Sequence, residues 1–358
     1  MLTVWKAPGV GVVLLAAWMV ALPARAGRFE TYSPQGSFDL PGGASVFNVL
    51  TDGRVIALSG ADIYVESAPG SRSFNVQGAL AGMDVPGFGS SFLSVSPDGS
   101  KFAVGNGGGA TFGNFQVGVF DTATLTGDWF SASHFDAAWL DGSRLAVTAG
   151  SFGSPARVTL LDTTSADPAN PINPSIIDNI GGSSAGITFD AAGNLYTGNG
   201  FDLDGAVGSN TGDLKIFDAA TLASAIGGGG VLDFETQGAF LGRLLSASSL
   251  GFDDEGNLFV GGGDLFGSGD GDYAGLVRSG AVAGVLSGGG PVDVLDPNQV
   301  RRFDPDGVSA QNFYDLAFNP TLGELYVRQG QTVYVLPEPS MVVLLCAGGL
   351  ILRRPRRS

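Results

Sequence analysis

Ile187-Thr188-Phe189-Asp190-Ala191-Ala192-Gly193-Asn194-Leu195-Tyr196 has the pattern of a β-hairpin, because two short and largely apolar segments flank a turn that contains Asp and Gly. A Gly in such a turn takes the positive φ that joins two twisted antiparallel strands. Similar units lie at residues 47–58, 93–104, 138–147, 250–260 and 316–327. The chain therefore contains an internal repeat that is read six times.

A third strand follows most of these hairpins, as at Gln116–Asp121 and Arg157–Asp162. A weaker fourth strand precedes the next unit, as at Ser73–Gln77, Trp129–Ser131 and Val231–Phe234. Four antiparallel strands in a repeat of 43 to 67 residues are typical of a β-propeller blade. A β-sandwich would explain the short strands but not the regular repeat. We therefore predict an all-β fold, a six-bladed β-propeller of four-stranded antiparallel blades.

The two longest units could hide a seventh blade. Ile216-Phe217 and the Gly228–Gly230 run that follows it recur as Leu276-Val277 and Gly288–Gly290. The extra length is therefore predicted to be a shared insertion, one helical turn and then a Gly run, between the third and fourth strands. To close the ring, we expect Arg28–Tyr32 at the mature N-terminus to pair with the last blade, since such pairing covers two open sheet edges.

The composition limits the possible functions. The chain has 358 residues, 58 of them Gly, and 44% are hydrophobic, which favours a turn-rich fold with a large core and excludes general disorder. The formal net charge of −16 argues against a nucleic-acid partner, because phosphate binding needs clustered Lys and Arg. The single cysteine is Cys346, near the C-terminus, so a disulfide framework and a Cys-ligated zinc site are excluded.

The N-terminal end has the features of a secretory signal. Lys6 precedes an apolar run from Val10 to Leu22, and Ala24-Arg25-Ala26 then fits the small-x-small pattern that signal peptidase cleaves. The apolar run is too short to span a membrane comfortably. We predict a signal peptide at residues 1–26, and the alternative is an anchor that is not cleaved.

The C-terminal end combines a Pro337-Glu338-Pro339 triplet, an apolar stretch from Met341 to Leu352, and a cluster of cations made of Arg353, Arg354, Arg356 and Arg357. Such cations keep the end of a short apolar segment on the cytoplasmic side. Together these features resemble a PEP-CTERM sorting signal. The resemblance implies recognition by an exosortase, transient attachment to the inner membrane of a Gram-negative bacterium, and a final place at the cell surface or outside the cell.

The two end segments define the domain boundaries and change the charge. We predict a propeller domain at residues 27–336 and a sorting tail at residues 337–358; a tail anchor that is never cut is the alternative. Because six of the 18 cations lie in residues 1–26 and 340–358, residues 27–339 keep 12 cations against 34 acids, a formal charge of −22. That charge favours solubility and the attraction of divalent cations.

Two long loops between second and third strands are rich in Asp and Gly. Their acidic residues are Asp202, Asp204, Asp213, Asp264, Asp270 and Asp272. Several carboxylates in a curled loop suit Ca²⁺, but the spacing is not that of an EF-hand, and solvated Asp and Gly turns are the alternative. Phe201 and Phe266 in the same loops are candidates for stacking on sugar rings.

The sequence identifies no catalytic residue. His134 is the only histidine, so a site with two histidine ligands is impossible, and neither a nucleophile elbow nor a phosphate-binding loop is present. We favour a non-enzymatic surface or matrix protein that binds polysaccharide, a cation or another protein. The alternative is a Ca²⁺-dependent hydrolase or lactonase, since gluconolactonase-like enzymes resemble this architecture and hold a Ca²⁺ in the central channel.

Overall fold

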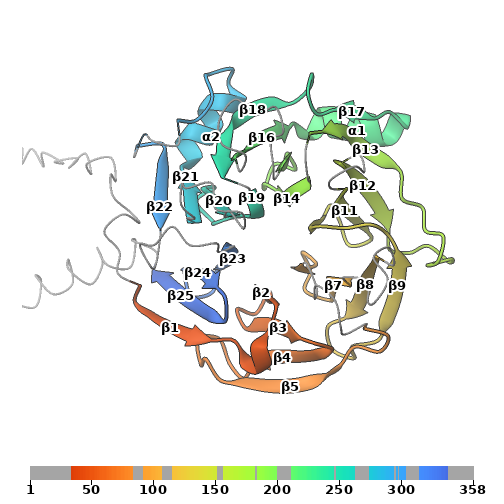
Figure 1. Cartoon of the computed structure of the whole chain (residues 1–358), viewed down its shortest axis with the longest axis vertical. Helices are drawn as coiled ribbons and strands as arrows, with labels where there is room; N and C mark the ends of the chain where they lie inside the picture. The colour runs from red at the N-terminus through yellow and green to blue at the C-terminus, as the bar shows by residue number, and fades with distance from the viewer. Residues whose placement is uncertain are drawn as a thin grey trace, which may run out of the picture.

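The computed structural model describes residues 34–83, 92–106, 115–150, 156–181, 184–199, 211–245, 247–262, 274–293, 296, 298–303 and 314–337. In these residues, six antiparallel sheets stand in a ring around a central channel (Figure 1). The innermost strand of each sheet lies against the innermost strands of its two neighbours, and the last sheet meets the first. The structure is thus the six-bladed propeller that the repeat predicts.

The blades are numbered in chain order, and the strands of each blade are given from the innermost strand to the outermost. Blade 1 consists of β2 (Val46–Val49), β3 (Val55–Ser59), β4 (Asp62–Glu66) and β5 (Phe74–Ala79). Blade 2 consists of β6 (Leu93–Val95), β7 (Lys101–Asn106), β8 (Gln116–Asp121) and β9 (Gly127–Ser131). Blade 3 consists of β10 (Ala137–Trp139), β11 (Arg144–Ala149), β12 (Ala156–Asp162) and β13 (Ser175–Ile180), with the two-residue β17 (Leu232–Asp233) added in parallel at its outer edge.

Blade 4 consists of β14 (Ser184–Phe189), β15 (Leu195–Asn199), β16 (Thr211–Phe217) and β18 (Ala239–Leu245). Blade 5 consists of β19 (Ala247–Phe252), β20 (Leu258–Gly262), β21 (Ala274–Val277) and β22 (Val300–Phe303). Blade 6 consists of β23 (Tyr314–Asn319), β24 (Glu324–Gln329), β25 (Thr332–Pro337) and β1 (Gly36–Asp39), and a short 3-10 turn at Pro41–Gly43 leads into blade 1.

The hairpin turns form because an acidic or amide side chain accepts the free backbone N–H groups of the turn. Asp190 accepts hydrogen bonds from Ala192 N and Asn194 N at 2.9 Å each, and Gly193 has a φ of 83°. Asp253 accepts from Glu255 N and Asn257 N in the same way. The repeated turn chemistry therefore fixes the register of each inner hairpin.

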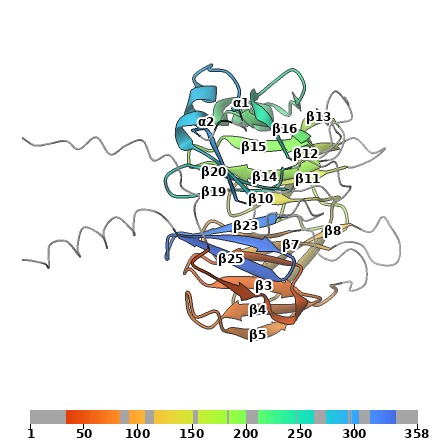
Figure 2. The same cartoon turned by 60° about the vertical axis from the view of Figure 1, so that its left-hand side comes forward.

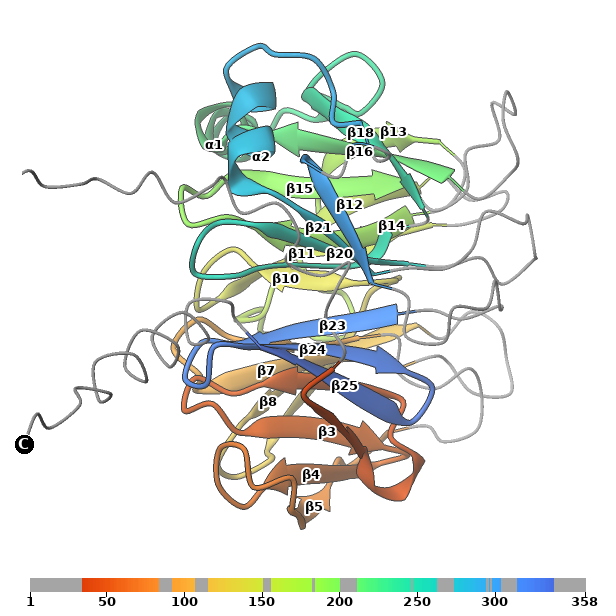
Figure 3. The ribbon, with the colours of Figure 1, turned by 90° about the vertical axis from the view of Figure 1, so that its left-hand side faces the viewer.

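The insertion shared by blades 4 and 5 is helical, as predicted, but the helices have ten and eight residues and are longer than the single turn expected. Helices α1 (Ala219–Gly228) and α2 (Ser279–Leu286) connect the third strand to the fourth in these blades. Figure 3 shows both helices at the same side of the disc. The predicted fourth strand at Val231–Phe234 was wrong, however: residues 232–233 form β17 on blade 3, and the fourth strand of blade 4 is β18. The Gly run carries the chain across to the preceding blade.

The ring is closed by a strand near the N-terminus that pairs with the last blade, as expected, but this strand is not the predicted one. Strand β1 at the start of the described chain pairs with β25, and Gly36 lies opposite Val335. The expected pairing strand, Arg28–Tyr32, lies outside the described residues. Because β25 then lies between β1 and β24, the last blade is built from both ends of the propeller, which closes the ring with main-chain hydrogen bonds.

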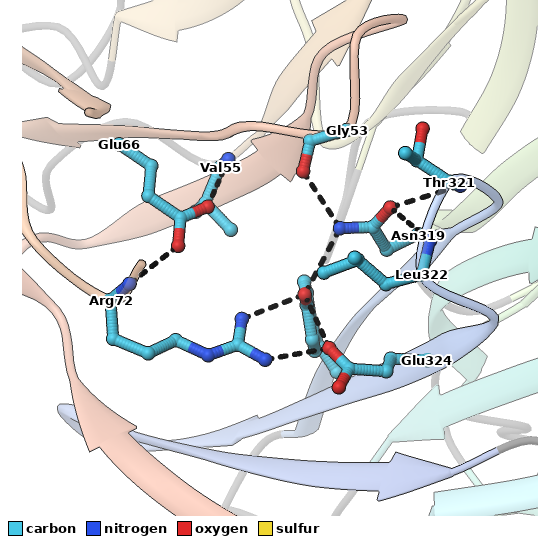
Figure 4. A network of polar contacts seen from close by, with 9 residues as sticks. Gly53, Val55, Glu66, Arg72, Asn319, Thr321, Leu322 and Glu324 are labelled. Atoms are coloured by element: carbon cyan, nitrogen blue, oxygen red, sulfur yellow. Dashed lines mark hydrogen bonds and ion pairs between the residues drawn. The ribbon is translucent and has the colours of Figure 1, made fainter. Parts of the chain in front are cut away.

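A polar network reinforces the seam between blades 6 and 1 (Figure 4). The Arg72 guanidinium donates to Tyr326 Oη at 2.7 Å and to Glu324 Oε2 at 2.6 Å. Asn319 Nδ2 donates to Gly53 O at 2.7 Å. Arg72 also lies 4.8 Å from the centre of the Phe38 ring. Blade 1 is thus tied to blade 6 by charge, hydrogen bonds and aromatic packing at once.

Strand direction assigns the connections to two faces of the disc, seen from the side in Figure 2. The short Asp-containing turns, both helices, the start of β1 and the end of β25 belong to one face, which we call the turn face. The connections between second and third strands, and between blades, belong to the opposite face, the loop face. In the part of the chain that the structure describes, no helix is long and apolar enough to cross a membrane.

Candidate functional site

The central channel is the most enclosed candidate site. It forms a cavity of about 260 Å³, lined by the inner strands of all six blades. Most lining residues are apolar or contribute backbone groups, and four polar side chains stand out: Asn48, Asp136, Ser249 and Asp315. The two carboxyl groups are the chemically most interesting of these.

Asp136 and Asp315 occupy equivalent positions in their blades. Each lies four residues before the start of the hairpin turn. The turn starts at Leu140 in blade 3, whose N–H donates to Arg144 O, and at Asn319 in blade 6, whose carbonyl accepts from Gly323 N. In a ring of six blades, blades 3 and 6 lie on opposite sides of the channel (Figure 1). The repeat thus places two acids across the channel from one another. Ser249 occupies the equivalent position in blade 5.

The Asp136 carboxylate ties blade 3 to blade 4. Its Oδ1 accepts a hydrogen bond from Ala137 N at 2.8 Å, and its Oδ2 accepts one from Ile187 N, in blade 4, at 3.0 Å. Its own backbone N–H donates to Thr148 Oγ1 at 3.0 Å. Both carboxylate oxygens therefore bind backbone N–H groups, which fixes the side chain at the channel wall.

Asp315 joins three blades in a similar way. Its Oδ1 accepts from Leu316 N at 3.0 Å and from Ser249 Oγ, in blade 5, at 3.1 Å. The Phe47 backbone N–H, in blade 1, also donates to it. Arg328 Nε lies 3.6 Å from Asp315 Oδ2 and balances its charge. Each acid therefore bonds to the inner strand of the next blade around the ring.

Burial makes both carboxyl groups weaker acids. Loss of hydration raises the pKa of Asp136 to about 7, against the lowering effect of the Ile187 and Ala137 amides, and the charge of Asp315 adds a smaller rise. Burial also raises the pKa of Asp315, while Arg328 and the hydrogen bonds to Ser249 and Leu316 lower it. At neutral pH, Asp136 is therefore close to the midpoint of its titration.

The single histidine does not join these acids. His134 Nε2 lies 2.8 Å from Asn106 O, and its ring packs edge-on against Phe92 and Phe115. Burial lowers the pKa of His134 to about 4, so the imidazole is neutral at physiological pH. It is not among the residues that line the channel. His134 is therefore a partly buried residue of the segment between β9 and β10, held by ring packing and by its contact with Asn106.

Most of the predicted site residues cannot be placed. Outside the described residues lie the loop candidates Asp202, Asp204, Asp264, Asp270, Asp272, Phe201 and Phe266. The same holds for the processing residues Ala24, Ala26, Glu338, Pro339 and the four terminal arginines. Asp213 is described, and its Oδ1 accepts a hydrogen bond from Arg243 Nε at 2.9 Å. Within the described ranges, no group of three or more His, Cys, Asp or Glu side chains is arranged to hold a metal ion.

Sequence reasoning missed the two channel acids. Asp136 appears in the sequence only as a neighbour of His134, and Asp315 precedes the sixth hairpin. The signal that could have found them is their common distance from the turn, because the residues at this position in four blades line the channel: Phe92, Asp136, Ser249 and Asp315. Without the strand register, that spacing has no meaning.

The comparisons with known proteins give the fold alone. No family model matches the chain, and no curated protein sequence matches it. Among solved structures, the chain is similar to a PQQ-bound aldose sugar dehydrogenase from Streptomyces coelicolor, with a TM-score of 0.53 and 11% identity over 85% of this chain and 96% of that one. The PQQ domain of a pyranose dehydrogenase from Coprinopsis cinerea gives a TM-score of 0.53 and 12% identity, over 87% of this chain and 98% of that one.

A chain from a mitotic checkpoint complex gives a TM-score of 0.50 and 13% identity, over 94% of this chain and 98% of that one. The similar structures therefore include sugar dehydrogenases and a chain of a mitotic checkpoint complex, and identities this low carry no function from one to another.

The residues of the channel do not suit PQQ. This cofactor is a flat quinone that carries three carboxylates, so a binding site needs cationic partners and room for a fused ring system. The side chains described around the channel include two acids and no lining Lys or Arg, and the cavity of about 260 Å³ is below the usual range for ligand sites. The described lining of the channel therefore does not fit this cofactor.

Proposed function

We propose that the chain is an exported protein whose tail is sorted at the inner membrane, and whose propeller acts as a non-enzymatic binding scaffold at the cell surface or in the extracellular matrix. The observation that carries the proposal is the position of the tail. Pro337, the first residue of the triplet, is the last residue of β25 and pairs with Glu324. The sorting signal thus begins where the last blade ends.

The strand directions give the propeller an orientation. The end of β25 belongs to the turn face, so a tail held in the membrane would bring the turn face to the bilayer surface. Three residues separate Pro337 from the apolar segment that begins at Met341, a reach of about 10 Å in an extended chain. The long acidic loops start and end at strand ends that belong to the loop face and would point away from the membrane. These strand ends are Asn199, Thr211, Gly262 and Ala274. This arrangement suits capture of a partner from the outside.

The chemistry of the channel favours binding over catalysis. Asp136 Oδ2 accepts a hydrogen bond from Ile187 N in blade 4, and Asp315 Oδ1 accepts one from Ser249 Oγ in blade 5. The N–H of the following residue donates to each carboxylate as well. A general acid or base has to exchange a proton with a substrate, and these carboxylates are instead used to hold blades together. The extracellular partner that we propose is a polysaccharide or a surface protein, bound by the loop face.

The test of sorting is tail removal in an exopolysaccharide-producing host that has an exosortase. We expect the wild-type chain to lose its tail and leave the membrane fraction. Replacing Pro337, Glu338 and Pro339 by Ala should leave a longer, membrane-bound product. The matched control is Ser340→Ala, just outside the triplet, which should be processed normally. Equal processing of the triplet variant would contradict the proposal.

The test of the binding role uses the processed protein. We expect it to co-sediment with exopolysaccharide from the same host, and to lack Ca²⁺-dependent hydrolysis of sugar lactones. Lactone hydrolysis that is lost in Asp136→Asn would instead support the alternative hydrolase. A calcium titration by thermal melting, with magnesium as the control, tests the acidic loops: binding to the folded state raises the midpoint, and Asp202→Ala and Asp270→Ala should remove that rise.

A further inference from the structure

The outer strand of each blade exposes a row of backbone N–H and C=O groups, which is a template for pairing with another strand. Charged side chains protect such edges, and five of the six outer strands carry at least one: Asp39 in β1, Asp128 in β9, Asp178 in β13, Arg243 in β18, and Arg301 and Arg302 in β22. Strand β5 has the sequence Phe-Asn-Val-Gln-Gly-Ala and carries none. It is the outer strand with the least protection by charge.

Three outer strands are also covered by a segment from the next blade. Ser131 N, in β9, donates to Pro168 O at 2.9 Å. Strand β17 pairs with β13, and Val292 N donates to Leu241 O, in β18, at 2.7 Å. Across the described ranges, no strand pairs with β5 except β4, and β5 lies at the rim of the disc (Figure 1). Among the described residues, three outer strands are thus covered by a segment of the next blade, and the outer edge of β5 pairs with none.

The free backbone groups of β5 can be assigned from its register with β4. Ser67 N donates to Ser73 O, so this pair is hydrogen-bonded, and hydrogen-bonded pairs alternate along an antiparallel ladder. Val65 and Asn75 form the next such pair, while Tyr64 and Val76 face one another without bonds. The backbone N–H and C=O of Val76 therefore point away from β4, and its side chain is 59% exposed.

We propose that β5 pairs antiparallel with β5 of a second copy of this chain, about a two-fold axis through Val76. Pairing of identical strands is self-complementary: Val76, which directly precedes the β-bulge at Gln77, would exchange both hydrogen bonds with Val76 of the other copy. The strand is uncharged, whereas residues 27–339 carry a formal charge of −22, so this edge brings two copies together with little local repulsion.

Disulfide trapping tests this pairing in the full-length chain, purified in detergent. The native Cys346 is first replaced by Ser, and Val76→Cys is then introduced. Residues in a hydrogen-bonded antiparallel pair have Cα atoms about 5.5 Å apart, which a disulfide can span. We expect mild oxidation to convert Val76→Cys to a covalent dimer that reductant reverses. Asp128→Cys, on the charged and covered outer strand β9, is the matched control and should stay monomeric.

A second measurement keeps the proposal falsifiable if the cysteine variant fails to fold. Sedimentation of the unmodified chain should show a dimer that strengthens as salt screens the net negative charge. Val76→Lys should abolish the dimer without lowering the midpoint of thermal unfolding of the monomer. A monomeric unmodified chain, a dimer that persists in Val76→Lys, or equal trapping at positions 76 and 128 would each overturn the proposal.

Discussion

Replacing Arg72 by Met should weaken the seam at which the ring closes. The guanidinium makes two charge-assisted hydrogen bonds to blade 6, at 2.7 Å to Tyr326 and 2.6 Å to Glu324, and the ion-paired side chains are 24% and 19% exposed. A hydrogen bond to a charged group contributes about 1.5–3 kcal/mol, and partial exposure to water reduces this. We therefore expect a loss of about 2–4 kcal/mol in the free energy of unfolding, since Met keeps most of the apolar stem.

The assay is thermal and urea unfolding of matched variants. A loss of this size should lower the midpoint by about 3–6 °C in a domain of this length. Arg54→Met is the control, because the Arg54–Asp52 pair is also close, at 2.7 Å, but is 35% and 51% exposed and lies within one turn. Its expected effect is below about 1 kcal/mol. A double-mutant cycle with Glu324→Gln should give a coupling of about 1–3 kcal/mol. Equal effects of the two Arg variants, or a coupling near zero, would refute the reasoning.

Three further predictions concern the channel, the seam and the backbone. The pKa of Asp136 is raised to about 7 in the folded state, whereas an unfolded Asp ionises near pH 4. Between these pH values the folded state therefore binds more protons than the unfolded state. As a result, Asp136 makes the free energy of unfolding fall as the pH rises from about 4 to 7. Subtracting the pH profile of Asp136→Asn from that of the wild type should reveal this slope, and a flat difference would count against it. Phe38→Ala should cost about 3–5 kcal/mol in chemical unfolding, because its ring packs edge-on against Tyr326 at the seam. Gly53→Ala should lower the melting midpoint, because the φ of Gly53 is 86° and a Cβ there would lie 2.6 Å from Thr321. Gly280→Ala should raise the midpoint, because Gly280 lies in α2 with open space around it. The opposite order of the two midpoints would be inconsistent with the structure.

The sequence was enough to predict the fold, because each blade repeats a local pattern. Alternating apolar residues and an Asp or Asn at the turn act over a few residues, so they can be read without knowledge of distant contacts. The helical insertion was predictable for the same reason, since its two copies resemble one another. The fourth strand of blade 4 was misplaced because β17 is stabilised by blade 3, and pairing with another blade leaves no local signal.

The channel acids were not predictable in the same way. Asp136 and Asp315 are about 180 residues apart, and they gain meaning only when the ring places blades 3 and 6 opposite one another. The contact of Arg72 with Glu324 likewise depends on closure of the whole ring. The sorting tail differs, because its composition is itself the signal. It remains a prediction, since residues 338–358 lie outside the described ranges.

The central position of β25 in the last blade has a mechanical consequence. A pull on the tail would act along β25, which is held on one side by four residue pairs with β1 and on the other by six with β24. Force along a strand loads its hydrogen bonds together, and a strand at the edge of a blade would be held by one such ladder, whereas β25 is held by two. If the tail is held as we propose, the load therefore falls on a strand that is bonded on both sides.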